Sequence, residues 1–155
     1  MNMFCYQCEQ TSKGVGCTAF GNCGKDPQTA VLQDLLVYAL KDISCYAHRA
    51  RQMGAVDKAV NVFTVEALFS TLTNVDFDPT RFQKFLNEAA AIKEKAKSLY
   101  ETACKRQGKS PEQLACDVQW WTGPDDLNAL IEKGQLVGIQ DKINKLGPDV
   151  AGLQE

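Results

Sequence analysis

The helical fold is decided by residues 78–108, which read DPTRFQKFLNEAAAIKEKAKSLYETACKRQG. Asp78 is a favoured N-cap residue, and Pro79 suits the first helical position because the N–H that it lacks would have no partner there. Apolar residues then recur every three or four positions and so share one helix face: Phe82, Leu86, Ala89, Ile92, Ala96 and Leu99. We therefore predict one long amphipathic helix that ends near Gln107 and Gly108.

A helix is also predicted from Pro27 to about Met53. Asp26 precedes it as the N-cap, and Gly54 follows it as the kind of residue that ends a helix. Its apolar stripe has spacings of four, three, four and three residues and consists of Leu32, Leu36, Ala39, Ile43 and Tyr46.

A third helix is predicted between these two, from about Asp57 to Thr73. β-Branched residues are dense in this segment and would also suit a strand, but the helical spacing decides the prediction. We expect its buried side to consist of Val65, Leu68, Phe69 and Leu72.

Short turns join the three helices, which predicts an all-α fold with an antiparallel three-helix bundle over residues 27–108. Residues 1–26 are expected to form an irregular cysteine-rich loop, because glycines are frequent there and apolar residues show no period. Residues 109–155 are expected to contain short helices and to form the C-terminal side of the domain.

Within that C-terminal part, short helices are predicted to start near Ser110 and to run from Pro124 to Lys133. The Trp120-Trp121 pair between them is expected to cover a core. A further helix is predicted to begin at Pro148, seven residues before the last residue of the sequence. We therefore expect the chain to be a fragment that leads toward a missing second helical repeat.

The composition is that of a globular chain, with 23% charged and 45% hydrophobic residues and a formal net charge of −2. Acidic and basic residues alternate, so there is no concentrated basic patch and we expect no nucleic-acid partner. Apolar stretches are too short and interrupted to cross a bilayer, so no membrane partner is expected either. The first residues lack the basic and apolar runs of a secretory signal, which predicts a cytoplasmic protein.

The chain has seven cysteines, an odd number that argues against a disulfide framework in a chain without an export signal. In a reducing cytosol, clustered cysteines more often bind metal. The cluster lies within the first 23 residues and consists of Cys5, Cys8, Cys17 and Cys23. The scattered cysteines are expected to be small core hydrophobes or surface thiols: Cys45, Cys104 and Cys116.

The clustered cysteines have the spacing Cys-x2-Cys-x8-Cys-x5-Cys. The first two thiolates lie on one tight turn, and the glycines let the loop fold back so that the other two close the site. The glycines also let backbone N–H groups approach the sulfur atoms, as around iron–sulfur clusters. A four-cysteine zinc site typically has two Cys-x2-Cys pairs, and only one is present here. The spacing favours an iron–sulfur cluster over zinc, and unligated cysteines are a third interpretation.

Motifs around these cysteines resemble the N-terminal part of the hybrid cluster proteins, also called prismane proteins or hydroxylamine reductases. The resemblance rests on Met3-Phe4-Cys5-Tyr6-Gln7-Cys8-Glu9-Gln10-Thr11, Gly16-Cys17, Cys23-Gly24-Lys25, Leu32-Gln33-Asp34-Leu35-Leu36 and Phe69-Ser70-Thr71-Leu72-Thr73-Asn74. It implies a cubane-type cluster with Cys5, Cys8, Cys17 and Cys23 as ligands. The short Cys-x8-Cys spacing resembles the family branch with a [4Fe-4S] cluster rather than the branch with a [2Fe-2S] centre.

The resemblance also implies a function. Family members reduce hydroxylamine to ammonia and water, and nitric oxide reduction has also been proposed for them. The reaction takes place at a second, hybrid iron–sulfur–oxygen cluster, whose His, Glu and Cys ligands lie in later domains and have no counterpart here. The lone His48 is expected to be a solvated or capping residue, and Glu9 and Glu66 are assigned no catalytic role.

We therefore expect the chain to be an iron–sulfur electron-transfer domain of a longer oxidoreductase. The domain alone is not expected to be catalytic. Its expected partners are the remaining domains of the enzyme and an external electron donor. Two alternatives remain open: a stand-alone cysteine-rich module with structural zinc, and a short ferredoxin-like redox carrier or sensor.

Overall fold

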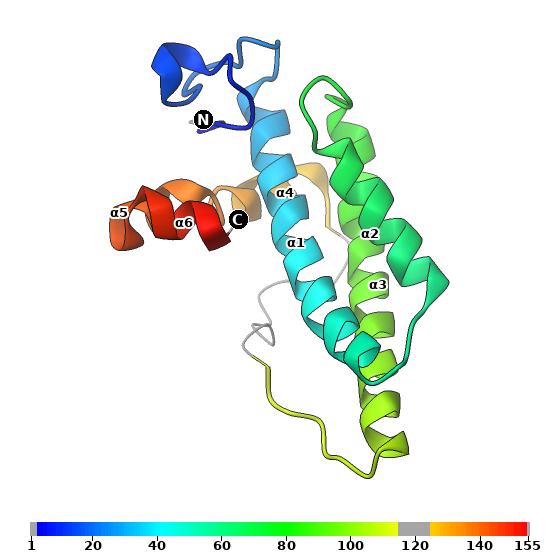
Figure 1. The fold of residues 1–155 in the computed structure, drawn as a ribbon. Helices are drawn as coiled ribbons and strands as arrows, with labels where there is room; N and C mark the ends of the chain where they lie inside the picture. Colours follow the sequence, from blue (N-terminus) through cyan, green and yellow to red (C-terminus); the bar gives the residue numbers. More distant parts are fainter. Residues whose placement is uncertain (1–2, 115–124, 155) are drawn as a thin grey trace.

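The computed structural model describes residues 3–114 and 125–154 and shows an all-α architecture for them (Figure 1). A short 3-10 helix, η1, lies in the N-terminal loop, and the α-helices follow it along the chain. The elements are η1 (Ser12–Gly14), α1 (Pro27–Gln52), α2 (Lys58–Ser70), α3 (Pro79–Arg106), α4 (Leu127–Gly134), α5 (Ile139–Leu146) and α6 (Pro148–Gln154). The predicted fold class is confirmed.

The three long helices begin where their N-caps predict. Asp26 Oδ1 accepts a hydrogen bond from the Thr29 N–H at 2.7 Å, and this bond caps α1. Asp57 Oδ1 caps α2 through the Val60 N–H at 3.0 Å. Asp78 Oδ1 caps α3 through the backbone N–H of Thr80 at 2.9 Å. Each carboxylate satisfies a backbone donor that has no partner within its own helix.

Helices α1, α2 and α3 pack against one another, which fits a three-helix bundle (Figure 1). The interface between α1 and α3 is the most extensive, and the expected stripes of both helices supply it. The side chains that are fully excluded from solvent include Leu32, Leu36 and Ile43 on α1 and Phe82 and Leu86 on α3. Burial of these apolar side chains is the main force that holds the domain together.

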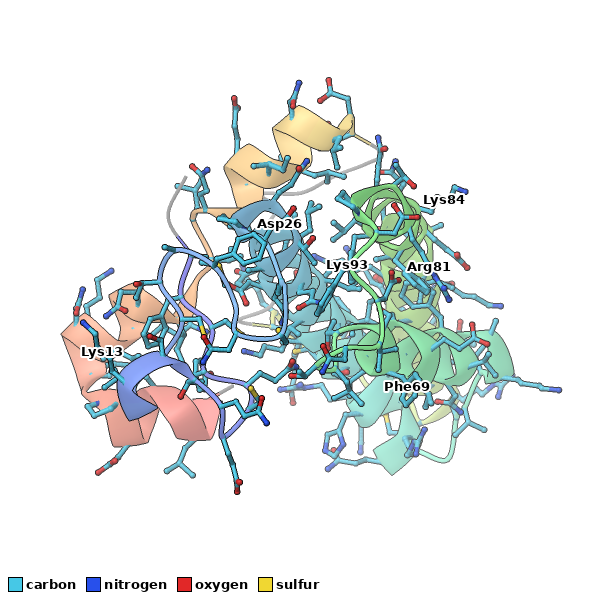
Figure 2. All side chains as sticks on the ribbon, turned by 90° about the horizontal axis from the view of Figure 1, so that it is seen from above. Lys13, Asp26, Phe69, Arg81, Lys84 and Lys93 are labelled. Atoms are coloured by element: carbon cyan, nitrogen blue, oxygen red, sulfur yellow. The ribbon has the colours of Figure 1, made fainter. Side chains whose placement is uncertain are left out.

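The predicted buried side of α2 is wrong. Val65 is 68% exposed and Phe69 is 59% exposed, and Leu68 and Leu72 are exposed as well. Figure 2 labels Phe69 on α2. The side of α2 that faces the bundle is instead formed by Val60, Phe63, Ala67 and Ser70.

The sequence of α2 explains this error, because the helix carries apolar residues on nearly its whole circumference and offers two stripes. The stripe with Val60, Phe63, Ala67 and Ser70 is buried against the bundle, and the stripe with Val65, Leu68 and Phe69 is left on the outside. The helix also ends at Ser70, three residues before the predicted end at Thr73.

The C-terminal helices lie beside the other flank of α1 (Figure 1). Helix α4 packs on α1 with no room to spare, because a Cβ atom on Gly134 would lie 2.5 Å from Val31 Cγ1 and 2.6 Å from the Val31 carbonyl oxygen. Helices α5 and α6 pack on each other. The helix predicted over Pro124–Lys133 is present as α4, capped by Asp126, and the helix predicted at Pro148 is present as α6.

The short helix predicted to start near Ser110 is absent from residues 109–114, which have no regular structure. There the Glu112 N–H donates to the Tyr100 hydroxyl at 3.0 Å, so a side chain of α3 takes the place of a helical carbonyl as its partner. Trp120, Trp121 and Cys116 lie outside the described residues. None of the described helices is both long and apolar enough to cross a membrane.

Candidate metal centre

The N-terminal loop, residues 3–26, lies beyond the N-terminal end of α1 (Figure 1). Its first residues are joined to its middle through Cys5 and Cys17, whose backbones form an antiparallel bridge. The Cys5 N–H donates to the Cys17 carbonyl at 3.0 Å, and the Cys17 N–H donates to the Cys5 carbonyl at 2.8 Å. This bridge holds the first cysteine of the Cys-x2-Cys turn beside the third cysteine, although eleven residues separate Cys5 from Cys17 in sequence.

The four clustered cysteines differ in burial. Cys17 is buried, while Cys5, Cys8 and Cys23 are half-buried. Each carries a free thiol, as a metal ligand must before it binds.

Polar groups surround the Cys17 sulfur. Its Sγ accepts a hydrogen bond from the Ser12 N–H at 3.5 Å. The pKa of the Cys17 thiol is lowered, chiefly by this N–H, then by the Asn22 backbone N–H, and further by the positive charge of Lys25. Burial acts in the opposite direction but does not outweigh these effects. The thiolate, which is the form that binds metal, therefore forms more readily at Cys17 than at an ordinary thiol.

Glycines shape the second half of the loop. A Cβ atom on Gly21 would lie 3.1 Å from the Cys23 sulfur, so a larger residue would crowd this thiol. Gly24 has a φ of +94°, a conformation that residues with a side chain rarely adopt. Gly21 and Gly24 are thus needed where the loop turns around Cys23.

Lys25 directly follows this turn and is buried, with 2% of its surface exposed. Its ammonium nitrogen lies 3.6 Å from Cys5 Sγ and 3.5 Å from Gln7 Oε1. Gln7 is itself held by the end of α2, because its amide Nε2 donates to the Thr71 carbonyl at 2.8 Å and its Oε1 accepts from the Thr73 hydroxyl at 2.7 Å. The loop is therefore attached to the bundle through its first cysteine turn.

Sequence reasoning assigned no role to Lys25 or Gln7, although both belong to the motifs quoted above. The spacing of the cysteines does not indicate that the Lys25 ammonium or the Gln7 amide has a role. The fold brings the Lys25 ammonium to the Cys5 sulfur and to the Gln7 amide oxygen. The other candidates lie elsewhere. His48 is exposed in the C-terminal half of α1, Glu9 and Glu66 are exposed, and Cys104 is buried in the core of the bundle.

The four sulfur atoms are not gathered into one coordination shell. In residues 3–114 and 125–154, no group of three or more His, Cys, Asp and Glu side chains is arranged closely enough to hold a metal ion. Four thiolates repel one another, so their convergence depends on the metal itself. The donor set nevertheless fits an iron–sulfur cluster, with four cysteines on one loop, N–H donors at a sulfur and a buried cation beside another sulfur.

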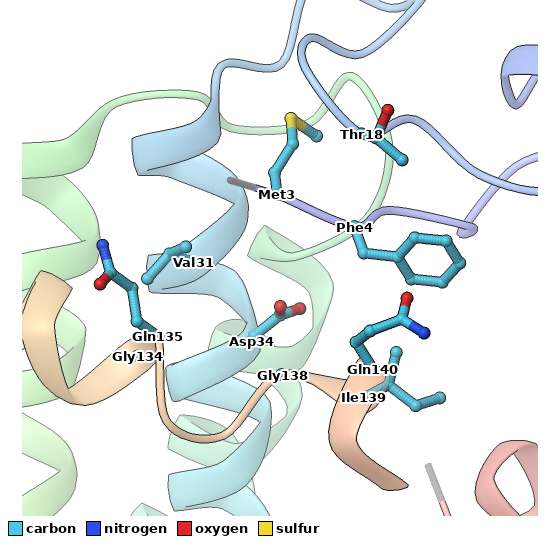
Figure 3. A pocket seen from close by; sticks show the side chains of 10 residues that line it. All are labelled: Met3, Phe4, Thr18, Val31, Asp34, Gly134, Gln135, Gly138, Ile139 and Gln140. Atoms are coloured by element: carbon cyan, nitrogen blue, oxygen red, sulfur yellow. The ribbon is translucent and has the colours of Figure 1, made fainter. Parts of the chain in front are cut away.

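Two of the cavities that border the loop are sizeable. The larger, of about 660 Å³, lies between Met3, Phe4 and Thr18 of the loop, the α1 side chains Val31 and Asp34, and the segment from Gly134 to Gln140 (Figure 3). The smaller, of about 250 Å³, is lined by Cys5, Gln7 and Lys25 together with side chains of α1 and α2. Of these two, the smaller cavity is the one that reaches a cysteine of the cluster, Cys5.

The fold and the loop define a class of protein, namely a helical domain with a four-cysteine segment at its N-terminal end. The family model described as the Prismane/CO dehydrogenase family matches residues 3–154. The chain therefore belongs to the Prismane/CO dehydrogenase family, which implies iron–sulfur chemistry and confirms the predicted membership.

Curated relatives agree with this assignment. The hydroxylamine reductase of Geobacter sulfurreducens is 48% identical over 140 residues, which are 90% of this chain and 26% of that protein. The hydroxylamine reductase of Rhodospirillum rubrum is 42% identical over 154 residues, 99% of this chain and 28% of the relative. The hydroxylamine reductase of Acidithiobacillus ferrooxidans is 46% identical over 154 residues, which cover 97% of this chain and 28% of that protein. The chain thus spans about a quarter of the length of these relatives.

Proposed function

We propose that this chain is the iron–sulfur electron-transfer domain of a longer hydroxylamine reductase, with Cys5, Cys8, Cys17 and Cys23 as the ligands of a [4Fe-4S] cluster. The observation that carries the proposal is the loop itself, in which the Cys5–Cys17 bridge, an N–H donor at Cys17 and a buried cation at Cys5 surround free thiols. The names of the relatives supply the proposed reaction.

When bound, such a cluster would accept and release single electrons. The chain's own groups would hold it and shape its surroundings. The Ser12 N–H and the Lys25 ammonium would place partial and full positive charge at two of the sulfurs. The glycines around Cys23 would let backbone approach the group closely.

The reaction of the longer protein would be the two-electron reduction of hydroxylamine, in which hydroxylamine, two protons and two electrons give ammonia and water. Nitric oxide reduction is a second proposed activity of the longer protein. The N–O bond would break at a hybrid iron–sulfur–oxygen cluster in the remaining domains. This chain would relay electrons to them from an external donor. A cytoplasmic location suits free thiols that must stay reduced to bind iron.

Metal analysis of anaerobically purified protein tests this proposal. We expect a brown protein that contains iron and acid-labile sulfide in equal amounts, about four of each per chain for a cubane cluster, and that bleaches on reduction. A colourless, folded protein with one zinc ion per chain would instead support the structural-zinc alternative and overturn the proposal.

A further inference from the structure

We propose that Lys25 is a fixed counter-charge for the cluster and that it raises the reduction potential of the cluster through Cys5. This inference rests on the proposed function and concerns a residue that is not a metal ligand. It starts from a buried ammonium group that forms no ion pair with a carboxylate of the described residues.

Lys25 is 2% exposed, and a buried lysine is normally paired with a carboxylate because removal of its charge from water is costly. Within the described part of the chain, the Lys25 ammonium forms no ion pair with a carboxylate. Its neighbours are the neutral Gln7 amide oxygen at 3.5 Å and the Phe77 ring, whose centroid is 6.0 Å away. The third neighbour is Cys5 Sγ at 3.6 Å. An anionic group at Cys5 would supply the compensation that these neutral neighbours do not.

The position of the ammonium is also fixed. Gln7 is held by Thr71 and Thr73 at the end of α2 and holds Lys25 in turn. At the other end of the residue, the Lys25 carbonyl accepts a hydrogen bond from the Gly21 N–H at 2.8 Å, which closes the turn around Cys23. The Lys25 side chain thus places its ammonium beside Gln7 and Cys5, while the Lys25 backbone closes the turn around Cys23.

The chemical consequence follows from charge. Reduction adds one negative charge to an iron–sulfur cluster, and a buried positive charge nearby stabilises the reduced form more than the oxidised form. Net charge and hydrogen bonds at the sulfurs are among the factors that set cluster potentials. Removal of the Lys25 charge should therefore make the cluster harder to reduce.

The test compares Lys25→Met with Lys25→Arg in the same anaerobic redox titration, followed by visible absorption and electron paramagnetic resonance. Methionine keeps much of the length of the side chain without its charge, and arginine keeps the charge. We expect Lys25→Met to lower the reduction equilibrium constant at least tenfold, which is 59 mV for a one-electron couple. Lys25→Arg should stay within threefold of the unmodified chain.

A second measurement uses the metal-free chain, where the buried charge has no anionic cluster to offset it. There Lys25→Met should raise the midpoint of denaturant unfolding, whereas a merely structural role for the ammonium predicts that the midpoint falls. Loss of iron from Lys25→Met with iron retained in Lys25→Arg would also support the counter-charge, because charge alone separates the two variants. Loss of iron from both would overturn it.

The two proposals fail in different ways. If the unmodified chain contains zinc or no metal, the proposed function is wrong and the counter-charge role falls with it. If iron and sulfide are complete in all three proteins and the potential of Lys25→Met is unchanged, the electron-transfer domain stands and the role of Lys25 is wrong.

Discussion

Cys5 and Cys17 face each other across two backbone hydrogen bonds of 3.0 and 2.8 Å. Among the described residues, this is the one place where two backbone segments pair as in a β-bridge. The bridge fixes the distance between the first and third cysteines before any metal binds. Cys8 and Cys23 take no part in this pairing and lie in a bend and a turn of the loop. The loop therefore contains one pair of cysteines with paired backbones and two cysteines outside that pair.

The first prediction concerns these ligands. Replacement of Cys5, Cys8, Cys17 or Cys23 by Ser should cause loss or conversion of the cluster, because the serine hydroxyl is a poorer ligand for iron in such clusters than thiolate. Iron and sulfide content, measured after anaerobic reconstitution, checks this.

The matched control is Cys104→Ala, which removes a thiol from the core of the bundle, where Cys104 is 2% exposed. This variant should lose some stability but keep its iron. Iron loss from Cys104→Ala with an unchanged circular dichroism spectrum would show that the ligand assignment is wrong.

The second prediction separates the two faces of α2. Phe63 is 4% exposed and contacts the Phe85 ring edge-on, with 6.2 Å between ring centroids, whereas Phe69 is 59% exposed. Phe63→Ala should lower the free energy of unfolding by about 3–5 kcal/mol. Phe69→Ala should change it by no more than about 0.5 kcal/mol. Chemical denaturation of the 155-residue chain measures both, and equal losses would contradict the observed orientation of the helix.

The contrast between α2 and its neighbours shows what sequence patterns can predict. Along α1 and α3, polar residues separate one apolar stripe from the rest, so Leu36 and Leu86 could be placed in the core from spacing alone. Along α2 the pattern is degenerate, and the choice between Phe63 and Phe69 depends on the shape of the groove that receives the helix. Tertiary packing decided that choice, and local periodicity carries no information about it.

The candidate site shows the same division. Spacing and the family resemblance single out the four cysteines of the loop, because ligand type and loop length are local properties. The contacts of Lys25 and Gln7 depend on where the end of α2 lies relative to the loop, over sequence separations of more than 60 residues in the case of Gln7 and Thr71. No local pattern encodes such a contact.

The third prediction concerns pH. The pKa of Asp78 is lowered by hydrogen bonds from the Thr80 side chain and backbone, and that of Asp57 is lowered first by the Val60 N–H and then by Lys95. A carboxyl group whose pKa is lower in the folded state than in the unfolded state stabilises the fold at pH values above its unfolded-state pKa, here 3.8. This contribution disappears as the pH falls through the folded-state pKa. The stability of the metal-free chain should thus decrease below about pH 4.

Thermal unfolding between pH 2 and 6 checks this, with the Asp57→Asn/Asp78→Asn double variant for comparison. Asparagine can still cap a helix but does not titrate, so the double variant should lose less stability over the acidic range. An identical acid dependence in both proteins would show that other carboxyl groups control it.

The fourth prediction tests the contact between α4 and α1. Gly134→Ala should destabilise the domain by about 1–3 kcal/mol, because its Cβ would meet the Val31 backbone, which cannot rotate away. Gly152→Ala is the matched control, since a Cβ there would meet nothing within 4 Å in helix α6. That change should be neutral or slightly stabilising, as glycine is a poor helix former. Equal stabilities of the two variants would contradict the close packing at Gly134.

The last prediction concerns activity. The four cysteines would occupy the outer position of all four irons of a [4Fe-4S] cluster, so no position would remain at which hydroxylamine could bind and be polarised. Among the described residues, no group of three or more His, Cys, Asp and Glu side chains is close enough to hold a metal, so the cysteine loop is the one metal site that we propose for them. The 155-residue chain should therefore accept electrons from dithionite and pass them to an artificial acceptor, but it should not turn over hydroxylamine. The assay is ammonia production with reduced methyl viologen as donor, without oxygen, and with Cys8→Ser as the control that lacks an intact cluster. Sustained ammonia production by the unmodified chain, and none by Cys8→Ser, would place an active centre within these residues and would overturn the assignment of a purely electron-transferring role.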